Sequence, residues 1–237
     1  MLHLLTFAAG GVDAVSYLGL EHVFTAMMTG NTVLLGLALG QGEIVAALRS
    51  VTALCGFALG VMVAAVIVAR RPSSEEWPPS VTTALALEAI VLATAAVIWR
   101  FTGLERTAAS VHTLIALFGA AMGMQAAAVR HLGVPGIATT YITGTVTSLF
   151  VDLVGWAKSQ RSRTAEAVTA EPAGAEWERR VGLLAGVFVV YGLGALVGGV
   201  LHSRTSFLGA LSPLIAVGVV VVNAGLRRGR AGSSAAG

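Results

Sequence analysis

The chain has 237 residues, of which 56% are hydrophobic and only 11% are charged, and its mean hydropathy is +0.82. Soluble domains average about 25% charged residues, so this composition excludes a soluble globular enzyme and is typical of a polytopic membrane protein. The net charge of +3 is small and no basic stripe exists, which excludes nucleic acid as a partner. The lipid bilayer is the expected partner.

Eight apolar segments follow one another along the chain, and most approach the roughly 20 residues that one membrane crossing needs. They cover residues 2–20, 22–40, 44–69, 81–101, 109–130, 136–157, 181–202 and 206–226. We therefore predict an all-α polytopic membrane protein with a single integral membrane domain over residues 1–226. The polar stretches 158–180 and 227–237 are expected to be a mobile cytoplasmic loop and a disordered cytoplasmic tail.

Two of these segments contain a polar break that resembles the start of a short helix. The first is Thr29-Gly30-Asn31, and the second is Thr143-Gly144-Thr145. Thr and Asn are favourable N-caps, and glycine lets a backbone or a ligand approach closely. Such a helix start favours anions or polar solutes, so these six residues are binding candidates. The alternative is a capped, packed kink in which the hydroxyls bond neighbouring helices.

The order of motifs predicts two tandem repeats of four segments each. Gly11-Val-Asp-Ala14 precedes the first break, and Gly123-Met-Gln-Ala126 precedes the second at a similar distance. Repeat one then covers about residues 1–104 and repeat two about 105–226. Internal repeats are common in secondary transporters, where the binding site lies between the halves.

The number of membrane crossings has two solutions. If both polar segments enter and leave on one side, six full transmembrane helices remain and the repeats are inverted. If all eight segments cross, the repeats are parallel. The length of the polar segments favours eight crossings, whereas the β-branched residues before each glycine favour broken half-helices. The positive-inside rule places the 158–180 loop and the C-terminus in the cytoplasm in both cases.

Three further polar residues fall within apolar segments. Asp13 is either a binding or relay group or a structural carboxylate that bonds the broken backbone nearby. Its counterpart in the second repeat is Gln125, which does not titrate. Glu88 has no polar neighbour one turn away that could pair with it, so it is expected to need a partner on another helix.

No catalytic residues, cofactor or metal site are predicted, and the chain is not expected to be an enzyme. Cys55 is the only cysteine, and no His-Glu-x-x-His, Walker-type or dinucleotide-binding motif is present. Frequent pairs of glycines four residues apart predict close helix packing, within one subunit or in a homo-oligomer.

The segments Gly11-Val-Asp-Ala-Val-Ser-Tyr-Leu18 and Phe24-Thr-Ala-Met-Met-Thr-Gly-Asn31 resemble a known family, the YoaK-like bacterial inner-membrane proteins of domain-of-unknown-function family 1275. The resemblance covers nearly the entire chain and rests on a Gly-x-x-Asp-Ala element followed by Met-Thr-Gly-Asn. It implies about six membrane spans and a multi-pass location in the inner membrane. It implies no substrate.

The leading functional hypothesis is a small-solute transporter or permease for a polar or anionic solute. In it, the two breaks together with Asp13, Glu88 and Gln125 line a site between the repeats. The rival hypothesis is a membrane scaffold or partner protein in which the same groups only hold the packing together.

Overall fold

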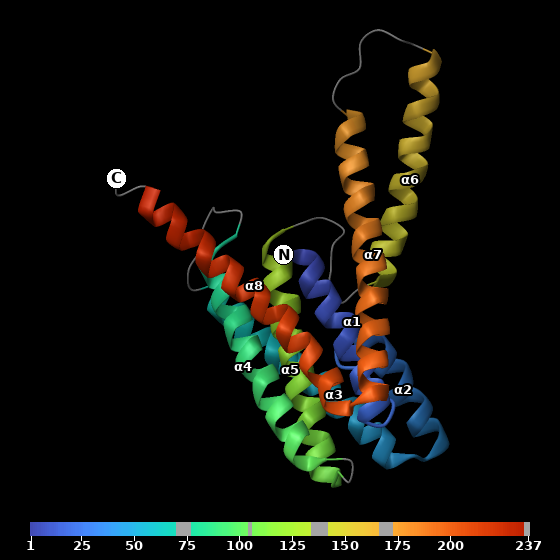
Figure 1. The fold of residues 1–237 in the computed structure, drawn as a ribbon. Helices are drawn as coiled ribbons and strands as arrows, with labels where there is room; N and C mark the ends of the chain where they lie inside the picture. The colour runs from blue at the N-terminus through green and yellow to red at the C-terminus, as the bar shows by residue number, and fades with distance from the viewer. Residues whose placement is uncertain (70–76, 104–105, 134–141, 166–172, 235–237) are drawn as a thin grey trace.

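The computed structural model describes residues 1–69, 77–103, 106–133, 142–165 and 173–234, and within these ranges every regular element is a helix (Figure 1). The eight helices are α1 (Leu2–Gly19), α2 (Met28–Gln41), α3 (Ile44–Ala69), α4 (Pro79–Thr102), α5 (Ala108–His131), α6 (Ile142–Ala165), α7 (Ala173–Arg204) and α8 (Ser206–Ser234). The predicted all-α class is therefore confirmed.

Five helices are long and apolar enough to cross a membrane: α3, α4, α5, and the parts of α7 and α8 that cover Val181–Arg204 and Ser206–Arg228. These spans also leave many large apolar side chains exposed, such as Ile90 and Ile215, each 63% accessible. Lipid tails can cover such surface, whereas water would make it costly. The chain is a multi-pass membrane protein.

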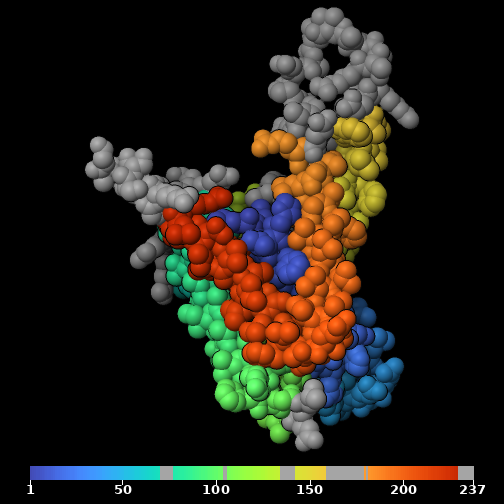
Figure 2. Space-filling view, viewed as in Figure 1, coloured from blue at the N-terminus to red at the C-terminus, as the bar shows by residue number. Residues whose placement is uncertain are grey.

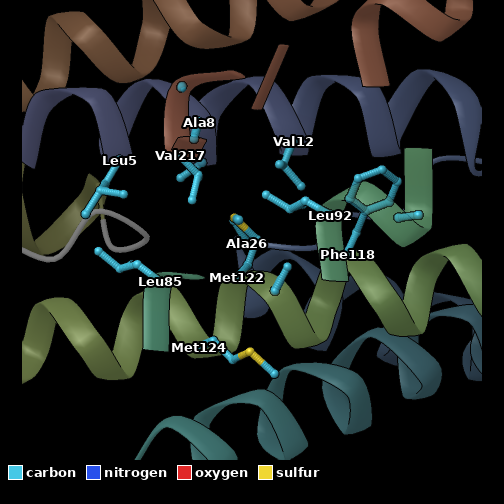
Figure 3. Close-up of a cluster of buried hydrophobic side chains, with 14 of the residues drawn as sticks. Leu5, Ala8, Val12, Ala26, Leu85, Leu92, Phe118, Met122, Met124 and Val217 are labelled. Atoms are coloured by element: carbon cyan, nitrogen blue, oxygen red, sulfur yellow. The ribbon is translucent and has the colours of Figure 1, made fainter. Parts of the chain in front are cut away.

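Helix α1 is the centre of the bundle. It packs against α5, α7 and α8, and Figure 2 shows its N-terminal half between the last two. Its Leu5, Ala8 and Val12 are fully buried and meet side chains of α4, α5 and α8 in the main apolar core (Figure 3). Because these neighbours shield it from lipid, α1 can hold the polar residues Asp13 and Ser16.

Two helix pairs approach each other unusually closely, α3 with α5 and α1 with α7. In the first pair, Gly60 faces the backbone of Ala120 and Gly123 faces that of Phe57. A β-carbon at either glycine would overlap the opposite backbone. The expected close packing through glycines four residues apart is therefore present here, and Gly56 and Gly119 extend the same contact.

The second close pair has the same form. Gly194 of α7 faces the backbone of Phe7, and Gly10 of α1 faces that of Tyr191. By contrast, a β-carbon at Gly36 or Gly40 on α2 would meet nothing within 4 Å. Not every glycine pair seen in the sequence therefore packs against the rest of the chain.

The directions of the helices follow from contacts at their ends. Nη1 of Arg106, just before α5, donates to the carbonyl of Gly19 at the end of α1, at 2.9 Å. Nε2 of Gln125, late in α5, donates to the carbonyl of Leu5, early in α1, at 3.0 Å. Helices α1 and α5 are therefore antiparallel.

Helices α4 and α8 are antiparallel as well. Nε1 of Trp99 near the end of α4 donates to Oγ of Ser206 at the start of α8, at 2.8 Å. Nη2 of Arg228, late in α8, donates to Oγ1 of Thr82, early in α4, at 3.0 Å. Figure 1 shows both chain termini on one side of the bundle and the α4–α5 connection at the other end.

Two expectations about segment ends were wrong. The stretch 158–180 is not a loop, because α6 continues to Ala165 and α7 begins at Ala173. The tail 227–237 is not disordered from its start, since α8 continues to Ser234. Ala, Arg, Lys, Gln and Glu are strong helix formers, which explains the extensions of α6 and α7, whereas the Gly- and Ser-containing end of α8 has no such explanation. The segment 22–40 is helical only from Met28 onward, as the β-branched residues before Gly30 predicted for a broken half-helix.

Candidate functional site

The segment between α1 and α2 is the structural break that the sequence analysis singled out. Residues 20–27 are not helical, yet Leu20, Val23, Thr25 and Ala26 are all almost completely buried. Glu21 and His22 turn the chain with left-handed φ angles of 62° and 65°. A buried backbone outside a helix must find hydrogen-bond partners elsewhere, because no water or lipid group replaces them.

Asp13 supplies most of those partners. Its Oδ1 accepts hydrogen bonds from the backbone N–H groups of Thr25 at 2.9 Å, Ala26 at 2.7 Å and Met27 at 3.3 Å. The carboxylate is only 4% exposed. It therefore satisfies the amides of the non-helical residues that lead into α2, up to the N-cap residue Met27, from a different helix.

Asn31 and Gly30 hold the other side of the break. Oδ1 of Asn31 accepts from the N–H of Phe24 at 3.0 Å, and its Nδ2 donates to the carbonyl of Phe24 at 2.6 Å. A β-carbon at position 30 would lie 3.0 Å from the Phe24 ring and 2.9 Å from Cε of Met27. Close contact with Phe24 and Met27 thus explains the glycine, and two hydrogen bonds to the Phe24 backbone explain the asparagine.

Thr29 does not cap α2. The N-cap is Met27, no side chain of its own segment caps it, and Thr29 is exposed in the first turn. The expectation that Thr or Asn of the motif would cap the half-helix was wrong for this break. The physical reason is that α2 begins at Met28, so Thr29 and Asn31 lie inside its first turn instead of in front of it.

Tyr191 is a member of the site that the sequence did not reveal. Its hydroxyl donates to Oδ2 of Asp13 at 2.6 Å, which links α7 to α1. Beside this contact, Ser16 and Thr25 share a hydrogen bond of 2.7 Å between their hydroxyl oxygens. A tyrosine inside the glycine-rich run of α7 was the available signal, but nothing in the sequence pairs it with a residue 178 positions earlier.

The remaining candidates come from other helices, Gln125 from α5 and residues 143–145 from α6. Gln125 is fully buried and bonds Leu5 as described above. Thr143 and Gly144 are exposed near the start of α6, whereas Thr145 is buried. Residues 134–141, which precede the second break, lie outside the described part of the chain. The structure thus brings together Asp13, Asn31 and Tyr191, and holds Glu88 elsewhere.

Glu88 is fully buried in α4, one turn from the core residues Leu85 and Leu92. Neither carboxyl oxygen has a hydrogen-bond partner among the described residues, so the expected partner on another helix is not found there. A buried polar group without a partner costs about 1–3 kcal/mol. Such a costly acid within a membrane domain is a functional candidate by default.

Replacing Glu88 with Met, a side chain of similar volume, is expected to raise the free energy of unfolding by about 1–3 kcal/mol. The gain arises because no hydrogen bond is lost and a buried polar group is removed. Thermal unfolding of the purified protein in detergent measures it. The same replacement at exposed Glu43 is the control and should change little. Lower stability of the Glu88 variant would show that the carboxyl is satisfied after all.

Comparison with known proteins supports the membrane assignment. A family model described as "Protein of unknown function (DUF1275)" matches residues 1–225. The chain is also 46% identical, over 155 residues, to the "UPF0700 transmembrane protein YoaK" of Bacillus subtilis (strain 168), which covers 65% of this chain and 67% of that protein. The resemblance inferred from the two motifs is confirmed. No solved structure matches the chain.

Proposed function

We propose that this chain, which belongs to the DUF1275 family, is a small-solute transporter or permease whose binding site lies between two inverted repeats. The family itself has no described function. The observation that carries the proposal is the antiparallel arrangement of corresponding helices around a broken helix. This architecture is typical of secondary transporters.

The helix directions support inverted repeats and six crossings. If all eight segments crossed in turn, the first and fifth would run in the same direction, and so would the fourth and eighth. The contacts of Arg106 and Gln125 make α1 and α5 antiparallel instead. Those of Trp99 and Arg228 do the same for α4 and α8. One segment of each half must then turn back on its own side.

Helix α2 is the segment that turns back in the first half. Its 14 residues span about 21 Å at 1.5 Å per residue, which is shorter than a hydrocarbon core of about 30 Å. The buried non-helical residues 20–27 lead into it. Neither α2 nor α6 is among the five helices long and apolar enough to cross, and α1, with 18 residues, would have to supply the sixth crossing. This agrees with two half-helices and six full crossings.

The packing of the glycines supports the repeat. Gly60 against Ala120 corresponds to Gly194 against Phe7, and Gly123 against Phe57 corresponds to Gly10 against Tyr191. Equivalent contacts thus join α3 to α5 and α7 to α1. The contacts make Gly10 the counterpart of Gly123, whereas the order of motifs aligned Gly11 with Gly123, so the two alignments differ by one residue.

The same correspondence makes the two halves chemically unequal. Phe57 in α3 takes the position of Tyr191 in α7. The first repeat therefore has no equivalent of the Tyr191 hydroxyl, which the second repeat supplies to Asp13. The hydrogen bond from Tyr191 to Asp13 joins the two repeats. A solute or proton that competes for Asp13 would change how the halves are held together, which is what alternating access requires.

The second candidate function is a membrane scaffold or partner protein, and one observation favours it. Asp13 accepts hydrogen bonds from the backbone of residues 25–27 and from Tyr191, and Asn31 exchanges two with the backbone of Phe24. That is the structural alternative considered for Asp13. Under this reading the motif holds the break in shape and binds no solute.

Topology tests the six-crossing arrangement first. In a Cys55→Ser background, single cysteines at exposed Ala109 and Thr205 are labelled with an impermeant thiol reagent in intact cells. With six crossings both positions lie on the same side of the membrane, and with eight they lie on opposite sides. Equal labelling is expected. Labelling on opposite sides would refute inverted repeats.

Flux measurements then separate transport from scaffolding. Reconstituted vesicles are tested with chloride, phosphate, acetate and glutamate, in the wild type and in Asp13→Asn. The Asn variant keeps an oxygen for the three amides but loses the charge, so it should fold while losing saturable flux. If none of the four solutes crosses the vesicle membrane or raises the unfolding temperature, the scaffold reading is favoured. An orientation with the C-terminus in the cytoplasm of an inner membrane is part of the proposal.

A further inference from the structure

A cluster of nitrogen donors lies at the end of the bundle opposite the chain termini, near the α4–α5 connection (Figure 1). Arg106 is its centre. Its guanidinium carbon lies 3.9 Å from the centroid of the Trp99 ring, and its Nη1 donates to Gly19. The ring of His202 meets the same Trp99 edge-on, with centroids 5.9 Å apart. The cluster therefore joins α1, α4, α5 and α7.

Three nitrogen atoms of this cluster have no hydrogen-bond partner among the described residues. They are Nε and Nη2 of Arg106 and Nδ1 of His202, and all three atoms are buried. The Trp99 N–H cannot help them, because it is itself a donor and is directed to Ser206. Unpaired buried donors cost free energy, and those of a charged group cost more than neutral ones.

No carboxylate in the described part of the chain neutralises Arg106. The ion pair described there joins Arg49 to Glu21 and leaves Arg106 out. Burial lowers the pKa of the Arg106 guanidinium below its ordinary value. Both Arg106 and His202 are only partly buried as whole residues, so the cluster lies next to the surface of the bundle.

The donor set suits a tetrahedral oxyanion. A guanidinium presents Nε and one Nη as a planar fork that matches two oxygens of a phosphate. The adjacent imidazole N–H of His202 could then reach the same group, in the tautomer that protonates Nδ1. Because the cluster adjoins the ends of membrane spans, a lipid phosphate lies at the corresponding depth.

We propose that Arg106 and His202 form a binding site for a phosphate group, supplied by the phosphodiester of an anionic lipid or by free phosphate. The bound group would satisfy the unpaired donors and tie the first repeat, through Trp99 and Gly19, to the second. The site is separate from Asp13 and does not depend on transport.

The full-length protein in detergent provides the test, with unfolding temperature as the readout. Phosphatidylglycerol is compared with phosphatidylcholine, and sodium phosphate with sodium chloride at equal ionic strength. The wild type should be stabilised by phosphatidylglycerol, by phosphate or by both. Stabilisation by the lipid alone identifies a headgroup site, and stabilisation by phosphate identifies a site for the free anion.

Arg106→Gln should weaken binding of the stabilising ligand by about tenfold or more, because two charge-assisted hydrogen bonds are lost. Arg100→Gln is the matched control, since Arg100 lies at the end of α4 beside Trp99 in the sequence but is exposed. Its guanidinium carbon is 6.0 Å from the Phe207 ring centroid. It should bind like the wild type.

Two further variants keep the test decisive if Arg106→Gln does not fold. Arg106→Lys retains the charge without the fork, and His202→Phe retains the ring contact with Trp99 without the donor. Both should bind more weakly than the wild type. The proposal is overturned if neither phosphate source stabilises the wild type, or if Arg100→Gln loses as much affinity as the Arg106 and His202 variants.

Discussion

Replacing Asp13 with Ala is expected to lower the free energy of unfolding by about 4 kcal/mol or more. The variant leaves four donors without an acceptor: the buried amides of Thr25 and Ala26, and the partly buried amide of Met27 and hydroxyl of Tyr191. Each buried donor left unpaired costs about 1–3 kcal/mol, and no water is at hand to replace the carboxylate in a membrane domain. The measurement is thermal unfolding in detergent, together with the amount of protein that accumulates in the membrane.

Two variants separate the parts of this effect. Asp13→Asn keeps one acceptor oxygen for the amides, so it should lose less than half as much stability as Asp13→Ala. Tyr191→Phe removes one of the four donors together with its need for a partner, and should cost only about 1 kcal/mol. An Asp13→Ala protein that unfolds at the wild-type temperature would contradict the structural role of the carboxylate.

Gly194→Ala is expected to lower the free energy of unfolding by about 3 kcal/mol, although it adds a single methyl group. The added β-carbon would overlap the backbone of Phe7, and backbone cannot rotate out of the way as a side chain can. Helices α1 and α7 would have to separate, which also strains the hydrogen bond between Asp13 and Tyr191. Chemical or thermal unfolding of the purified variant measures the loss.

The matched control lies two residues away on the same helix. A β-carbon at Gly192 would meet nothing within 4 Å, so Gly192→Ala should be neutral or stabilise the helix by up to about 1 kcal/mol. Gly60→Ala should resemble Gly194→Ala, because it overlaps Ala120 in the corresponding helix pair. If Gly60→Ala were harmless, the equivalence of the two helix pairs would be wrong.

Composition and apolar run length by themselves determined the class of this protein and most of its helices. The predicted segment 44–69 coincides with α3, because a long apolar run bounded by polar residues has only one way to satisfy its backbone in lipid. The predicted segment 22–40 includes six residues before α2 that are not helical. Val23, Phe24 and Ala26 are as apolar as a helix in lipid, so hydrophobicity did not mark this break, and only the β-branched residues before Gly30 indicated it.

The motifs also identified the correct polar residues without fixing their roles. The Asp13 carboxylate was open to a binding role or a structural role, because its amide partners are 12 to 14 residues away and Tyr191 is 178 away. Only the tertiary structure brings these groups together. The same holds for Arg106, whose contacts with Gly19 and Trp99 join helices that no periodicity relates.

The sequence by itself determines which segments form helices in lipid, because each helix satisfies its own backbone hydrogen bonds. What the tertiary structure decides is where polar groups from distant helices meet. The helix directions, the close glycine contacts and the carboxylate that holds the break all depend on how α1 and α7 pack together. That packing arises from long-range contacts, which the order of residues along one helix does not encode.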